Sequence, residues 1–273
     1  MKGTSVNNRF ESAPTLNFDT SWTSPPKDLT LGEDEVHVWR AALSVQGLHV
    51  QSLLRTLTAD ERARAERFHF QKDREQFIVA RGLLRTILGR YLDVDPRQLR
   101  FAYSSYGKPS LAGEFNAEAL CFNLSHADGL ALYAVTRGRQ LGIDIESVRA
   151  DLADEQVAER FFSIQEVAAF RALPGNMQCL AFFNCWTRKE AYIKARGEGL
   201  SLPLDQFDVS LAPGTPAALL RTYGDHREVS RWSLRELALE TGSVAALAVE
   251  GHGWRLKCYH WPKESHEAAA LEA

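Results

Sequence analysis

Two charged side chains, Glu190 and Lys194, lie on the apolar side of a helix predicted over residues 179–197. At about 100° of rotation per residue, they share an arc with the apolar residues Cys179, Phe183, Trp186 and Ile193. The other side, expected to be the polar one, carries Arg188, Lys189, Tyr192 and Arg196. Because a buried charge is costly without a partner or a metal, Glu190 and Lys194 either form an ordinary ion pair one turn apart or face a functional site.

A second acidic pair, Asp144 and Glu146, lies on a strand predicted over residues 141–146. Side chains alternate between the two faces of a strand, so these two carboxylates share one face. Two carboxylates in this spacing are most often a solvated face. Together with Glu190, however, they could give three oxygen ligands to a hard cation such as Mg²⁺, which keeps open positions for water and a phosphate.

Three arginines, Arg74, Arg81 and Arg85, occupy a narrow arc of a second helix predicted over residues 72–91. Apolar side chains flank this arc, so the arginines lie where burial is expected and need anions. Those anions could be carboxylates of the protein, or phosphates of a ligand bound through bidentate hydrogen bonds.

The segment from Asn123 to His126 carries an apolar strand into a polar turn that ends in a histidine. His126 could be a site residue that titrates near neutral pH, or a turn histidine with only local hydrogen bonds.

Composition excludes several classes of protein. The 273 residues are 45% hydrophobic and 25% charged, with a net charge of −3, which describes a globular chain of one large or two modest domains and argues against a nucleic-acid partner. Four cysteines form no CxxC pair and no secretory segment is evident, which favours a reduced, cytoplasmic setting. No apolar run is long enough to cross a bilayer, so no membrane span is expected.

The chain divides into four predicted segments. Residues 1–30, rich in Ser, Thr, Asn and Pro, are expected to be a flexible extension, followed by a lobe over 31–140, a second lobe over 141–262 and a tail over 263–273. Capping boxes at 58–61 and 163–166 open two helices. Strands are predicted near residues 36–41, 99–103, 120–124, 130–136, 207–211, 244–249 and 255–259. A weak similarity between residues 129–135 and 243–249 suggests pseudo-twofold halves.

Five motifs in order resemble the surfactin-type 4′-phosphopantetheinyl transferases over about residues 36–262. They are GKPSL from Gly107, FNLSH ending at His126, GIDIE ending at Glu146, FFS at 161–163 and WTRKEAYIKARGEGLSLPL from Trp186. The resemblance implies an α+β fold of two similar α/β lobes related by a pseudo-twofold axis. It also implies transfer of 4′-phosphopantetheine from coenzyme A to a serine of an acyl or peptidyl carrier protein, leaving adenosine 3′,5′-bisphosphate.

The same resemblance implies roles for individual residues. The magnesium ligands would be Asp144, Glu146 and Glu190, and Lys194 would contact the pyrophosphate that is cleaved. Coenzyme A would be bound by Gly107, Lys108 and Pro109 beside the adenine nucleotide, and by Ser125, His126 and Arg64 at the phosphates, with Arg81 as a further basic residue. Glu61 departs from the family pattern, because family members often carry a basic residue at its position.

The implied chemistry needs charge neutralisation and a base. Magnesium, Lys194 and His126 would stabilise the charge that develops on the leaving group, and Glu190 would accept the serine proton directly or through water. A metal-bound carboxylate is a poor base, so Glu190 cannot hold both roles fully.

Two alternatives to this enzyme stay open from the sequence. One is a carrier-binding module that has lost catalysis, which the intact acidic trio and Lys194 disfavour; the other is a different magnesium enzyme acting on a nucleotide pyrophosphate. The motifs do not separate magnesium from manganese, nor carriers of fatty acid, polyketide or nonribosomal peptide synthesis, since that choice lies in surface shape. With both lobes in one chain, a monomer is expected.

Overall fold

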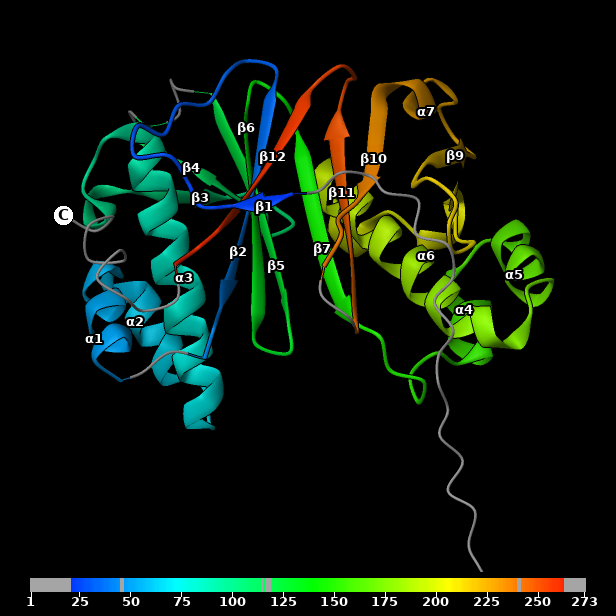
Figure 1. The fold of residues 1–273 in the computed structure, drawn as a ribbon, viewed down its shortest axis with the longest axis horizontal. Helices are drawn as coiled ribbons and strands as arrows, with labels where there is room; N and C mark the ends of the chain where they lie inside the picture. The colour runs from blue at the N-terminus through cyan, green and yellow to red at the C-terminus, as the bar shows by residue number, and fades with distance from the viewer. Residues whose placement is uncertain (1–20, 45–46, 114, 116–118, 240–241, 263–273) are drawn as a thin grey trace, which may run out of the picture.

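The larger of the two main sheets, here called the first, has the strand order β1-β12-β2-β6-β5. The computed structural model describes residues 21–44, 47–113, 115, 119–239 and 242–262 (Figure 1). The strands are β1 (Trp22–Thr23), β2 (Glu35–Ala42), β5 (Leu120–Ala127), β6 (Leu130–Arg137) and β12 (Arg255–His260). Three helices pack beside this sheet, namely α1 (Gly47–Thr56), α2 (Ala59–Glu66) and α3 (Gln71–Leu92).

The second sheet is smaller, with the order β10-β11-β7. Its strands are β7 (Leu141–Ser147), β10 (Trp232–Glu236) and β11 (Ser243–Glu250), and its helix is α6 (Gly175–Arg196). Smaller elements complete the chain: β3 (Phe101–Tyr103), β4 (Pro109–Leu111), α4 (Glu155–Phe161), α5 (Ile164–Arg171), β8 (Phe207–Val209), β9 (Leu219–Thr222), α7 (Arg227–Arg231), and short 3₁₀ turns at Pro96–Gln98, Gly199–Ser201 and Leu204–Gln206.

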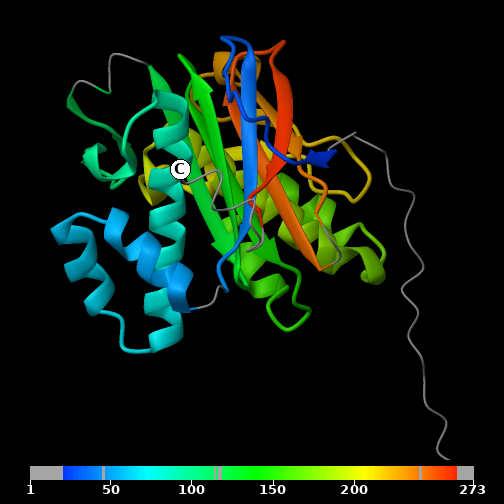
Figure 2. The same cartoon turned by 60° about the vertical axis from the view of Figure 1, so that its left-hand side comes forward.

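Strand periodicity explains how the two sheets face each other. In β2, Trp39 packs in the core beneath the first helices, whereas Val38 belongs to a different core cluster. In β11, Ala246 packs in the cluster that contains α6, whereas Leu247 joins the cluster of Val38. One face of the first sheet therefore packs against α1, α2 and α3, and one face of the second sheet packs against α6. The opposite faces of the two sheets pack against each other. Figures 1 and 2 show the resulting arrangement, with α3 and α6 on opposite sides of the strands.

The structure confirms the predicted α+β class with two lobes. Both capping boxes form: the Thr58 backbone N–H donates to Glu61 at 3.0 Å, and the Ser163 N–H donates to Glu166 at 2.9 Å. Strands β6 and β11, which carry the similar segments, each have a neighbouring strand on both sides. The division of the chain at residue 140 stays a prediction.

Two parts of the predicted organisation are wrong. The expected extension over residues 1–30 includes β1, which pairs in parallel with β12, and the Trp22 indole donates to the carbonyl of Ala238 at 2.7 Å. Strand β12, assigned from the sequence to the second lobe, pairs in parallel with β2 of the first sheet. Periodicity identifies a strand but not its partner. Residues 1–20 and the predicted tail over 263–273 lie outside the described residues.

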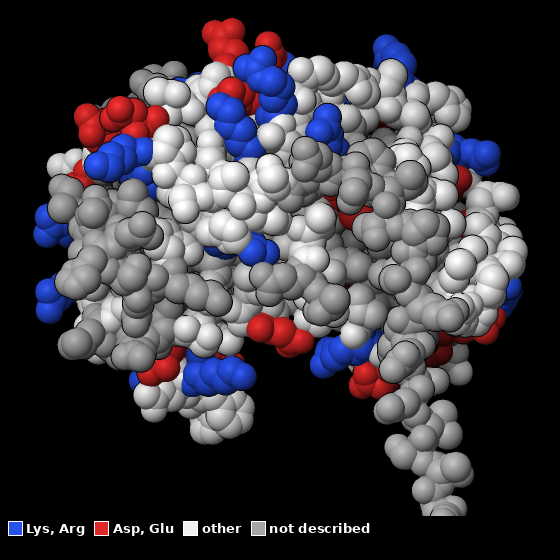
Figure 3. Space-filling model, viewed as in Figure 1, with Lys and Arg blue, Asp and Glu red and all other residues white. Residues whose placement is uncertain are grey.

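The composition of the chain is reflected in the charge on one face of the molecule and in the apolar character of its described helices. On the face seen in Figure 3, basic and acidic side chains of the described residues are intermixed, without an extended field of one sign. Among the described helices, none has the length and apolar character that a bilayer crossing requires.

Candidate active site

The close approach of α6 to β7 sets the geometry of the candidate site. Gly142 lies on the same face of β7 as Asp144 and Glu146, and a Cβ atom at this position would lie 2.2 Å from the carbonyl oxygen of Ala191 and 2.3 Å from the nitrogen of Ala195. No side chain larger than hydrogen fits there without a shift of the helix. The glycine therefore lets α6 lie directly on the strand that carries the two carboxylates.

Asp144 is the centre of a contact between the two lobes. Its side chain is 3% exposed, and its Oδ1 accepts hydrogen bonds from Lys194 Nζ at 2.6 Å and from Ser125 Oγ at 2.9 Å. Lys194 Nζ also donates to Ser125 Oγ at 3.1 Å. Asp144 Oδ2 is buried and has no hydrogen-bond partner in the described part of the chain. Asp144 Oδ1 is thus occupied by hydrogen bonds within the protein, and Oδ2 is available to a ligand.

Strands β5 and β7 bring Ser125 to this position from different sheets. The buried side chain of Asn123 accepts a hydrogen bond from the backbone N–H of Ile143 at 2.9 Å. Because successive residues point to opposite faces of a strand, this bond fixes the register in which Ser125 meets Asp144. The predicted turn segment from Asn123 to His126 is therefore part of β5.

The remaining carboxylates, Glu146 and Glu190, are half-buried and sense the same charges. Burial, and next the charge of Asp144, raises the pKa of Glu146 and of Glu190. Burial raises the pKa of Asp144 as well, although the Lys194 ammonium acts in the opposite direction. Three carboxylates therefore face one ammonium, so the site has an excess of negative charge that a bound cation would relieve.

His126 follows Ser125 at the end of β5 and is exposed. Partial burial of its ring, and next the Lys194 ammonium, lowers the pKa of His126. A neutral imidazole is therefore favoured at neutral pH, which leaves it able both to donate and to accept a hydrogen bond.

The fit of a metal ion can be judged from the donors. As placed, no three His, Cys, Asp or Glu side chains among the described residues form a group that could hold a metal ion. The donor set nevertheless has the chemistry of a divalent site, since Asp144 Oδ2 is a buried oxygen without a partner and three neighbouring carboxylates have raised pKa values. Carboxylate oxygens are the ligands that Mg²⁺ takes in proteins.

Comparison with known proteins places this site in a family. Residues 140–249 match the model of the 4′-phosphopantetheinyl transferase superfamily, and residues 44–137 match that of the 4′-phosphopantetheinyl transferase N-terminal region. The 4′-phosphopantetheinyl transferase HetI of Nostoc sp. is 44% identical over 241 residues, covering 88% of this chain and 98% of the relative. The chain belongs to the 4′-phosphopantetheinyl transferase superfamily.

More distant transferases match over shorter stretches. The 4′-phosphopantetheinyl transferase Sfp of Bacillus subtilis is 32% identical, covering 57% of this chain and 66% of the relative. The L-aminoadipate-semialdehyde dehydrogenase-phosphopantetheinyl transferase of Xenopus laevis is 27% identical, covering 71% and 68%. The family assignment predicted from the five motifs is confirmed.

The other residues that the transferase motifs single out lie away from Asp144. Gly107, with φ +82°, and Pro109 belong to the hairpin of β3 and β4. Lys108 extends from this hairpin to backbone carbonyls near the end of α6. Arg64 is on the exposed side of α2, with its guanidinium 5.4 Å from the centre of the Phe77 ring.

Two of the three predicted arginines of α3 have a protein carboxylate as their anion, whereas Arg74 is exposed and donates to the Phe68 carbonyl. Arg81 Nε donates to Glu61 Oε1 and Arg85 Nε donates to Oε2 at 2.7 Å. Arg85 also donates to the carbonyls of Pro96 and Leu99. Of the two alternatives left by the sequence, the structure therefore shows the internal ion pair for Arg81 and Arg85. Glu61, the departure from the transferase pattern, is the residue that pairs with both.

Sequence reasoning misjudged the far side of α6. Arg188 and Lys189, expected on the polar side, are 1% and 0% exposed. Lys189 Nζ donates to the carbonyls of Leu204 and Phe207 and pairs with Glu166 at 2.6 Å. The prediction treated the helix as covered on one side only, but β8 and α5 cover the other side. The capping box pointed to Glu166: its Oε2 accepts from the Ser163 N–H and also pairs with Lys189, while its Oε1 accepts from the Val209 N–H.

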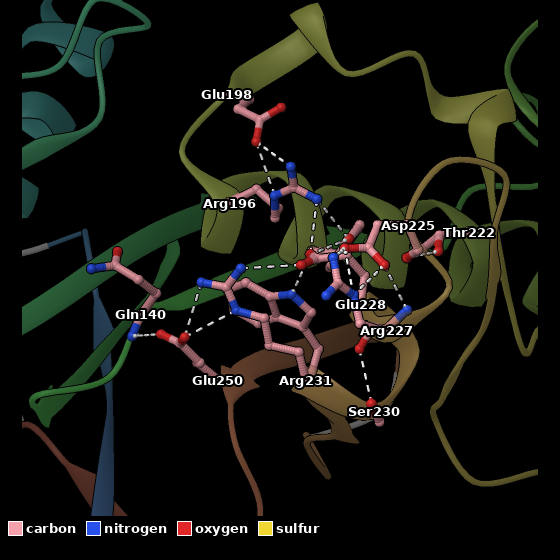
Figure 4. Close-up of polar contacts among 12 residues, drawn as sticks. Gln140, Arg196, Glu198, Thr222, Asp225, Arg227, Glu228, Ser230, Arg231 and Glu250 are labelled. Carbon is pink, nitrogen blue, oxygen red and sulfur yellow. Dashed lines mark hydrogen bonds and ion pairs between the residues drawn. The ribbon is translucent and has the colours of Figure 1, made fainter.

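The C-terminal end of α6 is held by a polar network that Figure 4 shows. Arg196 donates to Glu228 of α7 at 2.9 Å, and Arg231 donates to Glu228 at 3.1 Å and to Glu250 at 3.0 Å. Glu250 in turn accepts from the backbone N–H of Gln140 at 3.2 Å. The network links the end of α6, α7 and the residue before β7.

Proposed function

We propose that this protein transfers the 4′-phosphopantetheine group of coenzyme A to a serine hydroxyl of an acyl or peptidyl carrier protein. The observation that carries the proposal is the contact of Asp144, Ser125 and Lys194 between the two lobes of a member of this family. Two further carboxylates beside this contact provide the negative charge that a phosphoryl-transfer site uses to hold a cation.

In this proposal Asp144, Glu146 and Glu190 hold Mg²⁺, with Mn²⁺ as the alternative ion. The ion, when bound, offsets the negative charge of the pyrophosphate. Asp144 is oriented for this role because Lys194 and Ser125 both bind its Oδ1, which leaves Oδ2 for the ion. Lys194 Nζ contacts both Asp144 and Ser125, and from there its side chain would turn toward a pyrophosphate oxygen.

The reaction forms one phosphorus–oxygen bond and breaks another. The carrier serine Oγ attacks the β-phosphorus of coenzyme A, the bond from this phosphorus to the bridging oxygen breaks, and adenosine 3′,5′-bisphosphate leaves. The serine proton passes to Glu190, directly or through water. Burial, and next the charge of Asp144, raises the pKa of Glu190 in the metal-free site, whereas a bound cation would lower it, so the base role and the metal role of Glu190 compete. Lys194 and His126 would donate hydrogen bonds to the charge that develops on the leaving phosphate.

The rest of coenzyme A would lie along the first lobe. The hairpin residues Gly107 to Pro109 would border the adenine nucleotide through their backbone, and Arg64, whose side chain is exposed on α2, would bind its phosphates. Arg81 is tied to Glu61 and its guanidinium lies 4.2 Å from the centre of the Phe101 ring, so it would support the hairpin rather than bind phosphate.

The compartment, the oligomeric state and the partners of the protein are part of the same proposal. All four cysteines are free thiols, which suits the reducing cytoplasm. Both lobes that form the site belong to one chain, so the protein would act as a monomer. Its partners would be carrier domains of fatty acid, polyketide or nonribosomal peptide synthesis.

Mass spectrometry of intact carrier proteins tests this function. A panel of apo-carriers from the three kinds of pathway would be incubated with the protein, coenzyme A and Mg²⁺, and we expect a mass increase of one phosphopantetheine group on at least one carrier. Chelation of the metal should abolish the increase, and Mn²⁺ should be compared with Mg²⁺ in the restored reaction. Carrier binding without a mass increase would support a binding module instead, and cleavage of coenzyme A without carrier loading would support a different pyrophosphate enzyme.

A further inference from the structure

The Lys108 side chain leaves the first lobe and ends at α6. Its Nζ donates to the carbonyl of Ala195 at 2.9 Å, to the carbonyl of Leu141 at 3.1 Å and to Gln140 Oε1 at 3.3 Å. Burial lowers the pKa of Lys108 to about 8, as expected for an ammonium withdrawn from water. The side chain therefore joins the hairpin of β3 and β4 to the end of α6 and the start of β7.

The hairpin is a rigid support for this lysine. The Ser104 N–H donates to the Lys108 carbonyl at 3.0 Å, and the Gly107 N–H donates to the Ser104 carbonyl at 2.9 Å. Ser104 Oγ accepts from the Lys108 N–H at 3.1 Å. A turn whose backbone groups are bonded in this way leaves the side chain of Lys108 little freedom at its base.

The end of α6 is suited to an ammonium. Ala195 lies among the last residues of the helix, whose carbonyls have no partner within the helix, and a cation there also interacts favourably with the helix dipole. Gly197 ends the helix with φ +74°, and a Cβ atom on it would lie 3.1 Å from Lys108 Cδ. The aliphatic part of the Lys108 side chain thus packs against Gly197, where any larger residue would crowd it.

The same end of the helix is also held by the network of Figure 4. Arg196 binds Glu228, and the network returns through Arg231 and Glu250 to the N–H of Gln140. Since Gln140 Oε1 accepts from Lys108, the two sets of contacts meet at this residue. The C-terminal part of α6, which follows Glu190 and contains Lys194, is therefore held by both sets of contacts.

We propose that Lys108 is a positioning residue that holds the last turn of α6 against the start of β7. From the first lobe, the Lys108 ammonium thereby fixes the positions of Lys194 and Glu190 relative to Asp144. This inference rests on the proposed function, in which the backbone of the same hairpin borders the nucleotide. The hairpin would then connect nucleotide binding to the placement of the helix that carries the reacting groups.

Steady-state kinetics of Lys108→Met test the proposal. Methionine keeps an unbranched stem of similar size and removes the ammonium. We expect kcat to fall about tenfold or more, since misplacement of reacting groups has costs of this order, while KM for coenzyme A changes less than about threefold. Lys108→Arg, which keeps a cation, should recover part of kcat, and Lys72→Met on an exposed lysine should match the unaltered protein. A raised KM with unchanged kcat would overturn the proposal, because it would show that the ammonium binds the nucleotide directly.

Hydrogen–deuterium exchange gives a readout that does not depend on activity. In Lys108→Met, amides of residues 191–197 should exchange faster, with little change in the first turns of α6 or in the melting temperature. Unchanged exchange in this segment would overturn the proposal even if the protein is an active transferase. Faster exchange in a protein that transfers nothing would uphold the contact and refute the proposed function.

A second variant adds a double-mutant test of the same contact. Gly197→Ala keeps the ammonium but crowds the lysine stem and strains a positive φ. If Lys108 acts through α6, the losses of kcat in Gly197→Ala and in the double variant with Lys108→Met should be far from additive. Additive losses would overturn the proposal.

Discussion

At the scale of single residues, the site concentrates charge that the fold does not balance. Asp144, Glu146 and Glu190 lie near one ammonium, Lys194, and burial raises the pKa of each carboxyl. A structural ion pair in the same molecule is balanced instead, as buried Glu166 is by Lys189. Groups with perturbed pKa values in an unbalanced cluster are typical of functional sites, which favours a role in binding or catalysis over the simple ion pair.

Replacing Glu190 with glutamine separates these roles. Glu190→Gln keeps the shape of the side chain and removes one of three repelling charges, so we expect the midpoint of thermal unfolding to stay the same or rise. Transfer should fall at least about 100-fold, equivalent to about 2.7 kcal/mol of transition-state stabilisation. Carrier loading followed by mass spectrometry and thermal unfolding measure the two effects.

The matched control is Glu33→Gln, an exposed glutamate in the loop before β2. It should leave both quantities within error, because isolated surface charges contribute little. A Glu190→Gln protein that transfers at the rate of the control would contradict both the metal and the base assignments for this residue.

Charge on an apolar pattern was enough to find part of this cluster in the sequence. Glu190 and Lys194 stand out because each interrupts a hydrophobic face, and Asp144 because it shares a strand face with Glu146; the structure brings Lys194 and Asp144 into contact. The side-chain roles of Lys108 and Lys189 were not predictable in this way. Both donate to backbone carbonyls of distant segments, and no sequence pattern records a backbone acceptor.

At the scale of elements, the distance between α6 and β7 decides whether the site forms. Gly142 is the position where the helix and the strand touch. The helix is further fixed on its far side by Lys189, which binds Glu166 and two carbonyls. Contacts on both sides of α6 therefore prevent the helix from rotating about its axis. They thereby fix the direction in which Glu190 and Lys194 point.

Adding one methyl group at this contact should displace the helix. In Gly142→Ala the new Cβ would lie 2.2 Å from the Ala191 carbonyl oxygen, which is backbone and cannot turn away. We expect the free energy of unfolding to fall by about 2 kcal/mol or more, as in other overpacked interiors, and transfer to fall more than stability explains. Urea unfolding and carrier loading at a temperature where the variant is folded measure these effects.

Gly175→Ala is the control on the same helix, because nothing lies within 4 Å of its added Cβ. It should be neutral or slightly stabilising, since alanine is the better helix former. Equal effects from the two substitutions would show that Gly142 has no special role in the contact.

Another set of elements is joined by a buried histidine. His37 of β2 is hydrogen-bonded to Tyr91 of α3 at 2.8 Å and to Glu35 at 3.2 Å. Burial lowers the pKa of His37 from 6.5 to about 4. The unfolded chain therefore takes up a proton that the folded protein excludes, and stability is lost as pH falls from about 6.5 toward 4.

Urea unfolding at several pH values tests this linkage. Between about pH 7.5 and pH 5 the unfolding free energy should decrease by about 2 kcal/mol more in the unaltered protein than in His37→Gln, since one pKa unit corresponds to about 1.36 kcal/mol. Glu35, whose pKa is lowered to about 2 chiefly by its hydrogen bond with Lys257, adds a loss in the same direction only below its ordinary value. Parallel pH profiles for the two proteins would contradict the assignment.

Helices and strands could be predicted where the sequence carries local signals. The elements against which they pair or pack could not be predicted. Both capping boxes and the long helix α3 follow from the sequence, because caps and periodicity are local. Strand β12 joining the first sheet, and the cover of α5 and β8 over α6, are set by contacts between distant segments. The polar side assigned to α6 was wrong for this reason.

At the scale of the whole molecule, two lobes of similar build are used differently. Each has a helix against a sheet, and the free faces of the sheets meet in a shared core. The long helix of the first lobe uses Arg81 and Arg85 for internal pairing with Glu61, whereas α6 presents charges to the other lobe. The motifs predicted this two-lobed arrangement, but which side chains cross between the lobes depends on the register in which β5 meets β7.

That register depends on Asn123, which makes the last prediction a test of how the lobes fit together. Asn123→Ala removes the acceptor of the buried Ile143 N–H, so the unfolding free energy should fall by about 1–3 kcal/mol. Because Ser125 is two residues away on the same strand, its contact with Asp144 should loosen, and kcat should fall about tenfold or more. Asn184→Ala removes a buried hydrogen bond to the Leu211 carbonyl within the second lobe, and should cost similar stability while kcat is retained. Equal losses of kcat in the two variants would mean that general destabilisation, and not the fit between lobes, governs the activity.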